Sequence, residues 1–151
     1  MAILDTIDLA ILNELTSNAR KSLKELSAQI NLSAPAVATR IRRLEGDATI
    51  VGYHAVLDYE KLGYEMTAIV HAAVPPEKRQ AFCTFIRTQS QVITCDHITG
   101  SYSVVMRALC RNRRELSRVI AEVERFGKTQ TQLVLSSLRE PFAYASYEAS
   151  M

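Results

Sequence analysis

The sequence predicts an α+β protein in which a helical N-terminal part precedes a part that mixes strands and helices. Up to residue 45, apolar residues recur at helical spacing. From residue 66 onward, runs rich in β-branched residues alternate with helical stripes. At 151 residues, with 48% hydrophobic and 23% charged residues, the chain has a globular composition and enough length for one domain or two small ones.

The N-terminal part, residues 1–50, is expected to contain three helices. The first covers residues 4–15 and the second residues 22–30, both with apolar residues at i, i+3 and i+4 spacing. Asp5 and Asp8 lie in the first turn of the first helix, where carboxylates complement the helix dipole. Ser33 is well placed to cap the third helix, and Pro35 falls within the first turn of that helix, where its missing N–H costs nothing.

The third predicted helix has two different faces. At about 100° per residue, one side is apolar, with Val37, Ile41 and Leu44. The opposite side is small and basic, with Arg40 on its flank; its residues are Pro35, Thr39, Arg42 and Arg43. A helix, a short turn and a second helix of this kind are typical of a helix-turn-helix that enters the DNA major groove. The residues alone also fit a three-helix surface with a solvated arginine rim.

The charge distribution does not by itself indicate a nucleic-acid partner. Residues 1–60 hold six Lys/Arg and eight Asp/Glu, a balance of −2, whereas residues 61–151 hold twelve and eight, a balance of +4. A DNA footprint must therefore be local, formed by the arginines of the third helix with Arg20, Lys21 and Lys24 nearby.

Residues 51–65 are expected to link the two parts. The stretch "TIVGYHAVLD" (49–58) predicts a short hairpin or an extended segment in the position of a wing, and "YEKLGYE" (59–65) resembles a hinge. Residues 66–140 then follow the order β-α-β-β-α-β, which is the ferredoxin-like arrangement. Along its first strand the residues Met66, Ala68, Val70, Ala72 and Val74 alternate, and we expect this face to pack on another sheet.

The remaining features restrict location and chemistry. The tail, residues 141–151, has no periodicity, no apolar run reaches the length of a membrane span, and the acidic N-terminus is unlike a secretory signal, so we expect a cytoplasmic protein. Three cysteines without a CxxC pair favour reduced thiols. Cys95 and His97 share one strand face, and without further ligands nearby we favour packing over a metal pair.

Five stretches together resemble one known family. They are, in order, "LDTIDLAILNEL", "ELSAQINLSAPAVATRIRRLE", "GYHAVLDYEKLGY", "ITGSYSVVMRA" and "TQTQLVLS". Their order and spacing are similar to those of the leucine-responsive/asparagine-responsive (Lrp/AsnC) transcriptional regulators. The resemblance covers nearly the whole chain and implies an N-terminal domain that binds double-stranded DNA. It also implies a C-terminal domain that forms homodimers, often assembling into octamers, and senses a small molecule, usually an amino acid. It implies no cofactor.

The resemblance and the helix faces together give two sets of candidate residues. For DNA binding, the arginine side chains suit either guanine edges or phosphates, and the set is Ser33, Pro35, Thr39, Arg40, Arg42 and Arg43. For the effector, the family pattern implies the loop with Gly100 and the start of the last strand, and the set is Gly100, Ser101, Tyr102, Ser103, Thr129 and Thr131.

Two positions depart from the family pattern. Ala48 stands where a helix-ending glycine is expected; because alanine disfavours the left-handed conformation, we expect Asp47 or Gly46 to adopt it instead. Ser103 stands where many relatives have an acidic residue, which removes an obvious partner for the ammonium group of an amino acid.

Other function classes have less support. The sequence has no phosphate-binding glycine loop, dinucleotide fingerprint or nucleophile–base motif, so we do not expect an enzyme. An alternative regulator is an oligomerising amino-acid sensor or DNA-organising protein without a specific operator. The basic run "RNRRE" (111–115) fits DNA wrapping around an oligomer, although we favour a solvated loop.

Overall fold

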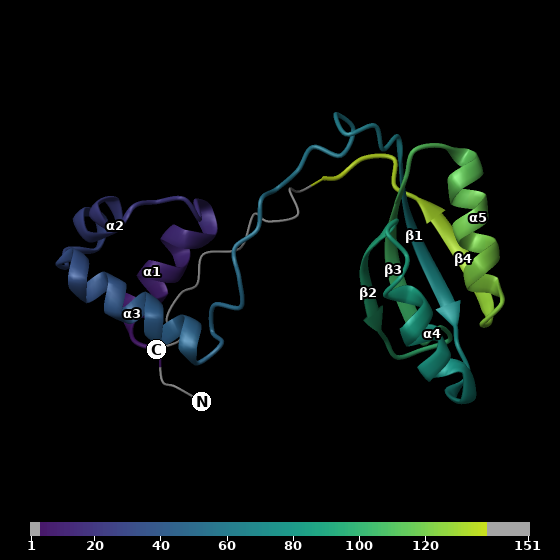
Figure 1. Ribbon diagram of the computed structural model, residues 1–151, viewed down its shortest axis with the longest axis horizontal. Helices are drawn as coiled ribbons and strands as arrows, with labels where there is room; N and C mark the ends of the chain where they lie inside the picture. The colour runs from purple at the N-terminus through teal and green to yellow at the C-terminus, as the bar shows by residue number, and fades with distance from the viewer. Residues whose placement is uncertain (1–3, 139–151) are drawn as a thin grey trace. The chain divides into compact units, whose positions relative to one another are not determined.

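The computed structural model describes residues 4–138, which form two compact units that divide between Val56 and Leu57 (Figure 1). This division lies within the predicted linker, residues 51–65. The predicted tail, residues 141–151, and the last two residues of the predicted 66–140 region lie outside the described residues. In the described part of the chain, no helix is long and apolar enough to cross a membrane.

The N-terminal unit contains the three expected helices: α1 (Thr6–Ser17), α2 (Leu23–Ile30) and α3 (Ala34–Gly46). The apolar faces that the periodicity predicts meet in one core, whose buried residues are Ile11, Leu15, Leu26, Val37 and Leu44. Burying these aliphatic side chains, each contributing about 1.5–3 kcal/mol, holds the three helices together. The helix-turn-helix arrangement is therefore confirmed.

The helix N-termini are capped in two different ways. Asp5 with Asp8 in α1, and Ser22 with Glu25 in α2, form reciprocal capping boxes. Ser33 occupies the N-cap position of α3 but makes no side-chain cap hydrogen bond, so the capping prediction is wrong in its chemistry. Pro35 has no N–H and so removes the donor at N2. The caps of α1 and α2 use the N–H at N3, and Ala36 still supplies that donor in α3, so the proline alone does not account for the missing bond.

The C-terminal end of α3 also differs from the expectation. Ala48 itself adopts the left-handed conformation, with φ of 59°, whereas Asp47 has φ of −90° and Gly46 belongs to the helix. The expected transfer of this conformation to Asp47 or Gly46 is therefore wrong. The Ile50 N–H donates to the Leu44 carbonyl oxygen at 2.9 Å, which gives a hydrogen-bond donor to one of the last carbonyl groups of the helix. This hydrogen bond spans Ala48 and helps to hold it in the left-handed conformation.

Of the two alternatives for residues 49–58, the structure has the extended segment. Residues 51–58 form neither strand nor helix, so the hairpin alternative is wrong. Several apolar side chains of this segment are exposed, among them Val51, Val56 and Leu57.

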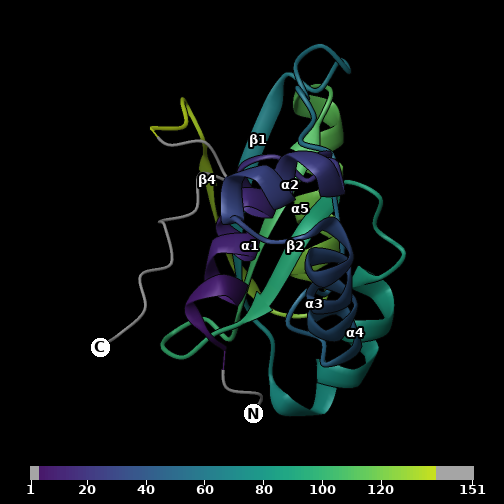
Figure 2. The ribbon, with the colours of Figure 1, turned by 90° about the vertical axis from the view of Figure 1, so that its left-hand side faces the viewer.

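The C-terminal unit is a four-stranded antiparallel sheet with helices on one face. Its strands are β1 (Met66–Ala73), β2 (Val92–His97), β3 (Val104–Cys110) and β4 (Lys128–Leu133). Its helices are the 3-10 turn η1 (Pro76–Lys78), α4 (Arg79–Ile86) and α5 (Arg113–Glu124). The strand order β2-β3-β1-β4 is that of the predicted ferredoxin-like fold, and α5 runs along β1, β3 and β4 (Figures 1 and 2).

The alternating apolar residues of β1 face these helices. Ala68, Val70 and Ala72 are fully buried in a core to which α4 contributes Phe82 and α5 contributes Val123. The expectation that this face packs on another sheet is therefore wrong, because alternation identifies a buried face but not what covers it. The opposite, open face is not covered by a helix of this unit; it comprises Thr67, Ile69 and His71 of β1, Val105, Arg107 and Leu109 of β3, and Gln130 and Gln132 of β4.

The strain at Ala48 leads to a stability prediction. Replacing Ala48 with glycine removes the Cβ clash of the left-handed conformation, so the free energy of unfolding of the N-terminal unit should rise by about 1 kcal/mol. Chemical denaturation followed by circular dichroism at 222 nm measures this change.

Ala38→Gly is the matched control, because Ala38 lies inside α3. There the same substitution should lower the free energy of unfolding by about 1 kcal/mol. A destabilising effect of Ala48→Gly equal to that of Ala38→Gly would contradict the left-handed assignment.

Candidate DNA-binding and effector sites

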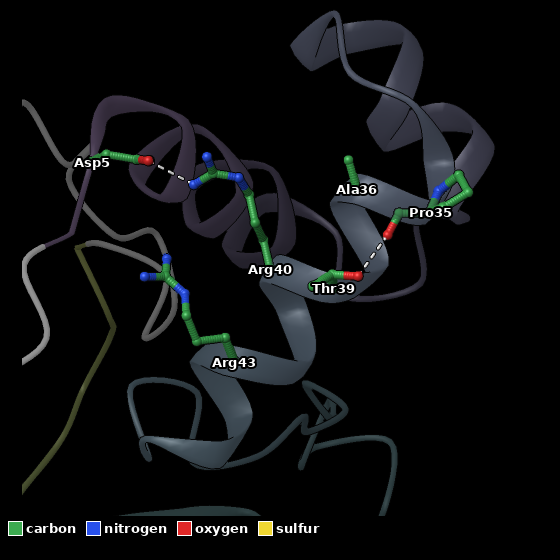
Figure 3. A pocket seen from close by; sticks show the side chains of 6 residues that line it. All are labelled: Asp5, Pro35, Ala36, Thr39, Arg40 and Arg43. Atoms are coloured by element: carbon green, nitrogen blue, oxygen red, sulfur yellow. Dashed lines mark hydrogen bonds and ion pairs between the residues drawn. The ribbon is translucent and has the colours of Figure 1, made fainter.

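An open hollow lies along the outer face of α3. It has a volume of about 570 Å³, and Figure 3 shows the side chains that line it: Asp5, Pro35, Ala36, Thr39, Arg40 and Arg43. Four of the six predicted DNA-binding residues are thus brought together. Thr39 is held to its own helix, because its hydroxyl donates to the Pro35 carbonyl oxygen at 3.0 Å.

Two carboxylates from the start of α1 hold the arginines of this hollow. Arg40 Nη1 donates to Asp5 Oδ2 at 2.7 Å and to Asp8 Oδ1 at 2.8 Å. Arg43 Nη2 donates to Asp8 Oδ2, the second oxygen of the same carboxylate. Asp8 is fully buried, whereas the side chains of Arg40 and Arg43 remain 28% and 45% exposed. The two guanidinium groups are therefore anchored from inside and open to solvent outside.

The protonation of Asp8 follows from competing effects. Burial raises the pKa of its carboxyl, but hydrogen bonds from Arg43, the Asp5 N–H and Arg40 outweigh burial and lower the pKa to about 2. Hydrogen bonds to Asp5 and Asp8 raise the pKa of Arg40, and the hydrogen bond to Asp8 raises the pKa of Arg43. Asp8 is the buried charged residue of the N-terminal unit's described part, and it stays ionised near neutral pH because both of its oxygens have cationic partners.

The remaining predicted DNA-binding residues lie outside the hollow. Arg42 is exposed, and its Nε donates to the Ala38 carbonyl oxygen at 3.3 Å; Ser33, at the N-cap, is exposed as well. Among the other cations of this unit, Lys21 pairs with Glu14. Within residues 4–138, no carboxylate pairs with Arg20, Lys24 or Arg42, so these three are available to an external anion.

The predicted effector residues gather at one end of the sheet in the C-terminal unit. Gly100, in the turn between β2 and β3, has φ of 111°, a conformation that favours glycine. The Ser103 side chain is hydrogen-bonded to the backbone: its hydroxyl donates to the Val74 carbonyl oxygen at 3.0 Å and accepts from the Val74 N–H at 3.0 Å. The hydroxyl thereby joins the end of β1 to the start of β3.

Within this unit the effector set is divided between the two faces of the sheet. The Tyr102 ring lies 5.6 Å from the ring of His71, a residue of the open face that sequence reasoning missed. Thr129 and Thr131 lie opposite Ala72 and Val70 in the register, so they share the helix-covered face. Thr129 donates to Glu124 of α5 at 3.1 Å. One protomer therefore does not bring all six residues into one pocket.

The other candidate sites show mainly structural contacts. Cys95 and His97 share the sheet face that carries Met106 and Val104, but no group of three metal-ligating residues exists in the described part of the chain. In the run 111–115, the Glu115 carboxylate accepts the Arg111 N–H at 2.7 Å and the Gln91 amide at 3.0 Å. Glu115 lies in the first turn of α5, where a negative charge complements the helix dipole.

Comparison with known proteins identifies both units. Residues 4–45 match the AsnC-type helix-turn-helix domain, and residues 67–143 match the Lrp/AsnC ligand binding domain. The chain is 32% identical to the HTH-type transcriptional regulator Ptr1 of Methanocaldococcus jannaschii over 119 residues, which are 79% of this chain and 80% of that protein. It is 30% identical to LrpC of Bacillus subtilis over 135 residues, which are 89% of this chain and 94% of LrpC.

Solved structures give the same result. The structure of LrpC from B. subtilis superposes with a TM-score of 0.87 and covers 91% of this chain and 98% of LrpC. The feast or famine regulatory protein Rv3291c from M. tuberculosis, complexed with L-methionine, is 26% identical and superposes with a TM-score of 0.85. It covers 94% of this chain and 99% of its own.

The fold and the comparisons define a helix-turn-helix transcriptional regulator with a C-terminal ligand-binding domain. The chain belongs to the Lrp/AsnC family. Its relatives are transcriptional regulators, not enzymes.

The Asp8 network leads to a prediction about acid stability. The pKa of Asp8 is about 2 in the folded protein and ordinarily 3.8, so its stabilising contribution is present above about pH 4 and is lost as the pH falls toward 2. Asp8→Asn should lower the free energy of unfolding by about 3 kcal/mol at pH 7 and should weaken its dependence on pH below 4. Denaturant titrations at pH 7, 4 and 3 measure both effects.

Asp58→Asn provides the control, since Asp58 forms an exposed pair with Lys61. Removing that pair should change stability at pH 7 by less than about 1 kcal/mol. An Asp8→Asn variant as stable as Asp58→Asn, with the acid sensitivity of the parent, would show that the buried carboxylate does not anchor the helices.

Proposed function

We propose that this protein is a sequence-specific DNA-binding transcriptional regulator that reads DNA with the outer face of α3 and responds to an amino acid. The observation that carries this proposal is the hollow on α3, where Arg40 and Arg43 are held by carboxylates while their side chains stay partly exposed to solvent. A guanidinium fork held in this way suits the O6 and N7 acceptors of guanine.

The cations around the hollow support a division of roles. Arg20, Lys24 and Arg42, which have no carboxylate partner in the described residues, suit phosphate contacts, the commoner kind in protein–DNA interfaces. Arg40 and Arg43, with Pro35 and Thr39, suit the base edges. Ser33, at the N-terminus of α3, suits a phosphate. The low net charge of the N-terminal unit is compatible with this scheme, because the proposed DNA contacts involve only the cations on and near α3.

The proposed acting species is a homodimer that assembles further, up to an octamer. The open face of the sheet supports an interface between copies, because it presents Ile69 and Val105 without a helix of its own unit to cover them. A two-fold dimer would present two α3 helices to half-sites about 34 Å apart, one turn of DNA, or a multiple of that distance.

The proposed effector is an amino acid, and methionine is the first compound to test because Rv3291c is complexed with it. The turn that contains Gly100 and Ser101 offers backbone groups, and the neighbouring rings of Tyr102 and His71, tilted by 54° to each other, offer aromatic faces at the end of the sheet. Thr129 and Thr131 lie on the other face, so a ligand that contacts all of the set requires a second protomer. A bound effector regulates only if it binds two assembly states with different affinity.

Arg43→Ala tests the role of α3 in reading DNA. The substitution should weaken binding to the preferred duplex by about 1–3 kcal/mol and relax the preference at one base position, since it removes a bidentate contact. Anisotropy titrations with the preferred duplex and its single-base variants measure this loss.

Arg42→Ala is the matched control for Arg43→Ala. It should weaken binding to every duplex alike and make the salt dependence shallower, as expected for a phosphate contact. A uniform loss for Arg43→Ala, with its base preferences intact, would assign Arg43 to the phosphates and contradict the reading role.

Thermal unfolding with a panel of amino acids tests the sensor role. A ligand at about 100 times its Kd adds ~2.7 kcal/mol to the stability of the folded state, which corresponds to several degrees in Tm for a chain of this length. Methionine or a related amino acid should raise Tm at fixed protein concentration, and Tyr102→Ala should reduce the shift. No shift with any amino acid would contradict amino-acid sensing.

A further inference from the structure

The ionised groups at the hollow on α3 have no net charge, although this surface is the one proposed to read DNA. Arg40 and Arg43 contribute two positive charges, and Asp5 and Asp8 contribute two negative charges at hydrogen-bond distance. A surface that bound DNA by attraction to phosphates alone would be weakened by this arrangement, because phosphate affinity depends on uncompensated cations.

The two carboxylates differ in their access to solvent. Asp8 is fully buried, so an external phosphate cannot approach it, whereas the Asp5 side chain is 50% exposed and lines the hollow (Figure 3). The Asp5 carboxylate already neutralises part of the charge of Arg40, and it would repel a phosphate that approached the Arg40 guanidinium at short range.

The two oxygens of Asp5 make separate contacts. Oδ1 accepts the Asp8 N–H at 2.8 Å and caps α1, whereas Oδ2 accepts from Arg40 at 2.7 Å. Capping requires only one oxygen, and asparagine or serine supplies it equally well. The contact with Arg40 is thus an additional feature that the start of a helix does not need.

We propose that Asp5 is a specificity-determining positioning residue, which reduces the affinity of Arg40 for phosphates of any sequence and holds its guanidinium in the orientation that meets a base edge. This inference rests on the proposed function, since it assumes that the outer face of α3 binds DNA. It predicts that the carboxylate of Asp5 increases discrimination between DNA sequences at the expense of overall affinity.

The test compares Asp5→Asn with the parent protein in anisotropy titrations from 50 to 200 mM salt. One duplex is that enriched by the parent from a random pool, and the other is its scrambled counterpart. Asp5→Asn should bind the scrambled duplex up to about 8-fold more tightly at 0.1 M salt, with a salt slope steeper by about 0.9, as expected for one additional phosphate contact. The ratio of the two affinities should fall, because Arg40 keeps only its contact with Asp8 and is held less firmly.

Two further variants sharpen the test. Glu14→Gln removes one carboxylate of the same unit from a pair with Lys21 outside the hollow. It should leave the affinity ratio unchanged, since it alters charge without altering Arg40. Asp5→Ser caps α1 but is too short to reach Arg40, so it should reproduce the lower ratio of Asp5→Asn; thermal unfolding verifies that both variants are folded.

An affinity ratio that is the same in Asp5→Asn, Asp5→Ser and the parent would overturn the proposal and leave the proposed function standing. An increase for both duplexes equal to that of Glu14→Gln would also overturn it, because charge alone would then explain the change. A parent protein that enriches no sequence would reject the proposed function and this inference together.

Discussion

The buried Asp8 carboxylate is the contact on which the N-terminal unit depends most. It lies at the start of α1, yet both of its oxygens accept hydrogen bonds from guanidinium groups of α3, 32 and 35 residues further along the chain. An ionised carboxylate without partners would be too costly to bury, so the two arginines are required where they are. The apolar core holds the helices together, and this ion-pair network fixes the rotation of α3 relative to α1.

The C-terminal unit is constrained by different forces. Its helices cover one face of the sheet and leave the other half-buried and partly apolar. The end of the sheet is tied by Ser103, which bonds the backbone of Val74 and is therefore unavailable as a simple replacement for an acidic effector ligand. A ligand at this end would contact strands whose open face is the proposed dimer interface. Ligand binding and assembly would then be linked through one sheet.

The sequence was sufficient to predict the helices and the strand order. Apolar periodicity identified α1, α2 and α3, and the alternation of strands and helices identified the sheet. The main errors concern which residues contact one another, and not where the helices and strands lie. Alternation along β1 showed that one face is buried, but not that Phe82 and Val123 cover it. The helical spacing of about 100° per residue placed Arg40 and Arg43 away from the core of the unit. No local sequence pattern relates these arginines to carboxylates that lie more than thirty residues earlier in the chain.

Two smaller errors concern the two ends of α3. The sequence "SAP" shows that the donor at N2 is missing in α3, but the donor at N3 remains, so the absence of a side-chain cap at Ser33 could not be predicted from it. Ala48 adopts a conformation that its side chain disfavours because the hydrogen bond from Ile50 to Leu44 and the packing of Ile50 on the helical core offset the strain. Local preference is overruled there by contacts that only the folded unit contains.

Our main proposal is that DNA contacts the Asp8-anchored arginines of α3. Its most direct test is to record the Nε–H signals of the arginine side chains by NMR while titrating the full-length protein with its preferred duplex. We expect the Arg40 and Arg43 signals to shift strongly with the preferred duplex and less with a scrambled duplex. Unchanged Arg40 and Arg43 signals, with shifts confined to the arginines of the 111–118 region, would place the DNA on the C-terminal unit and contradict this proposal.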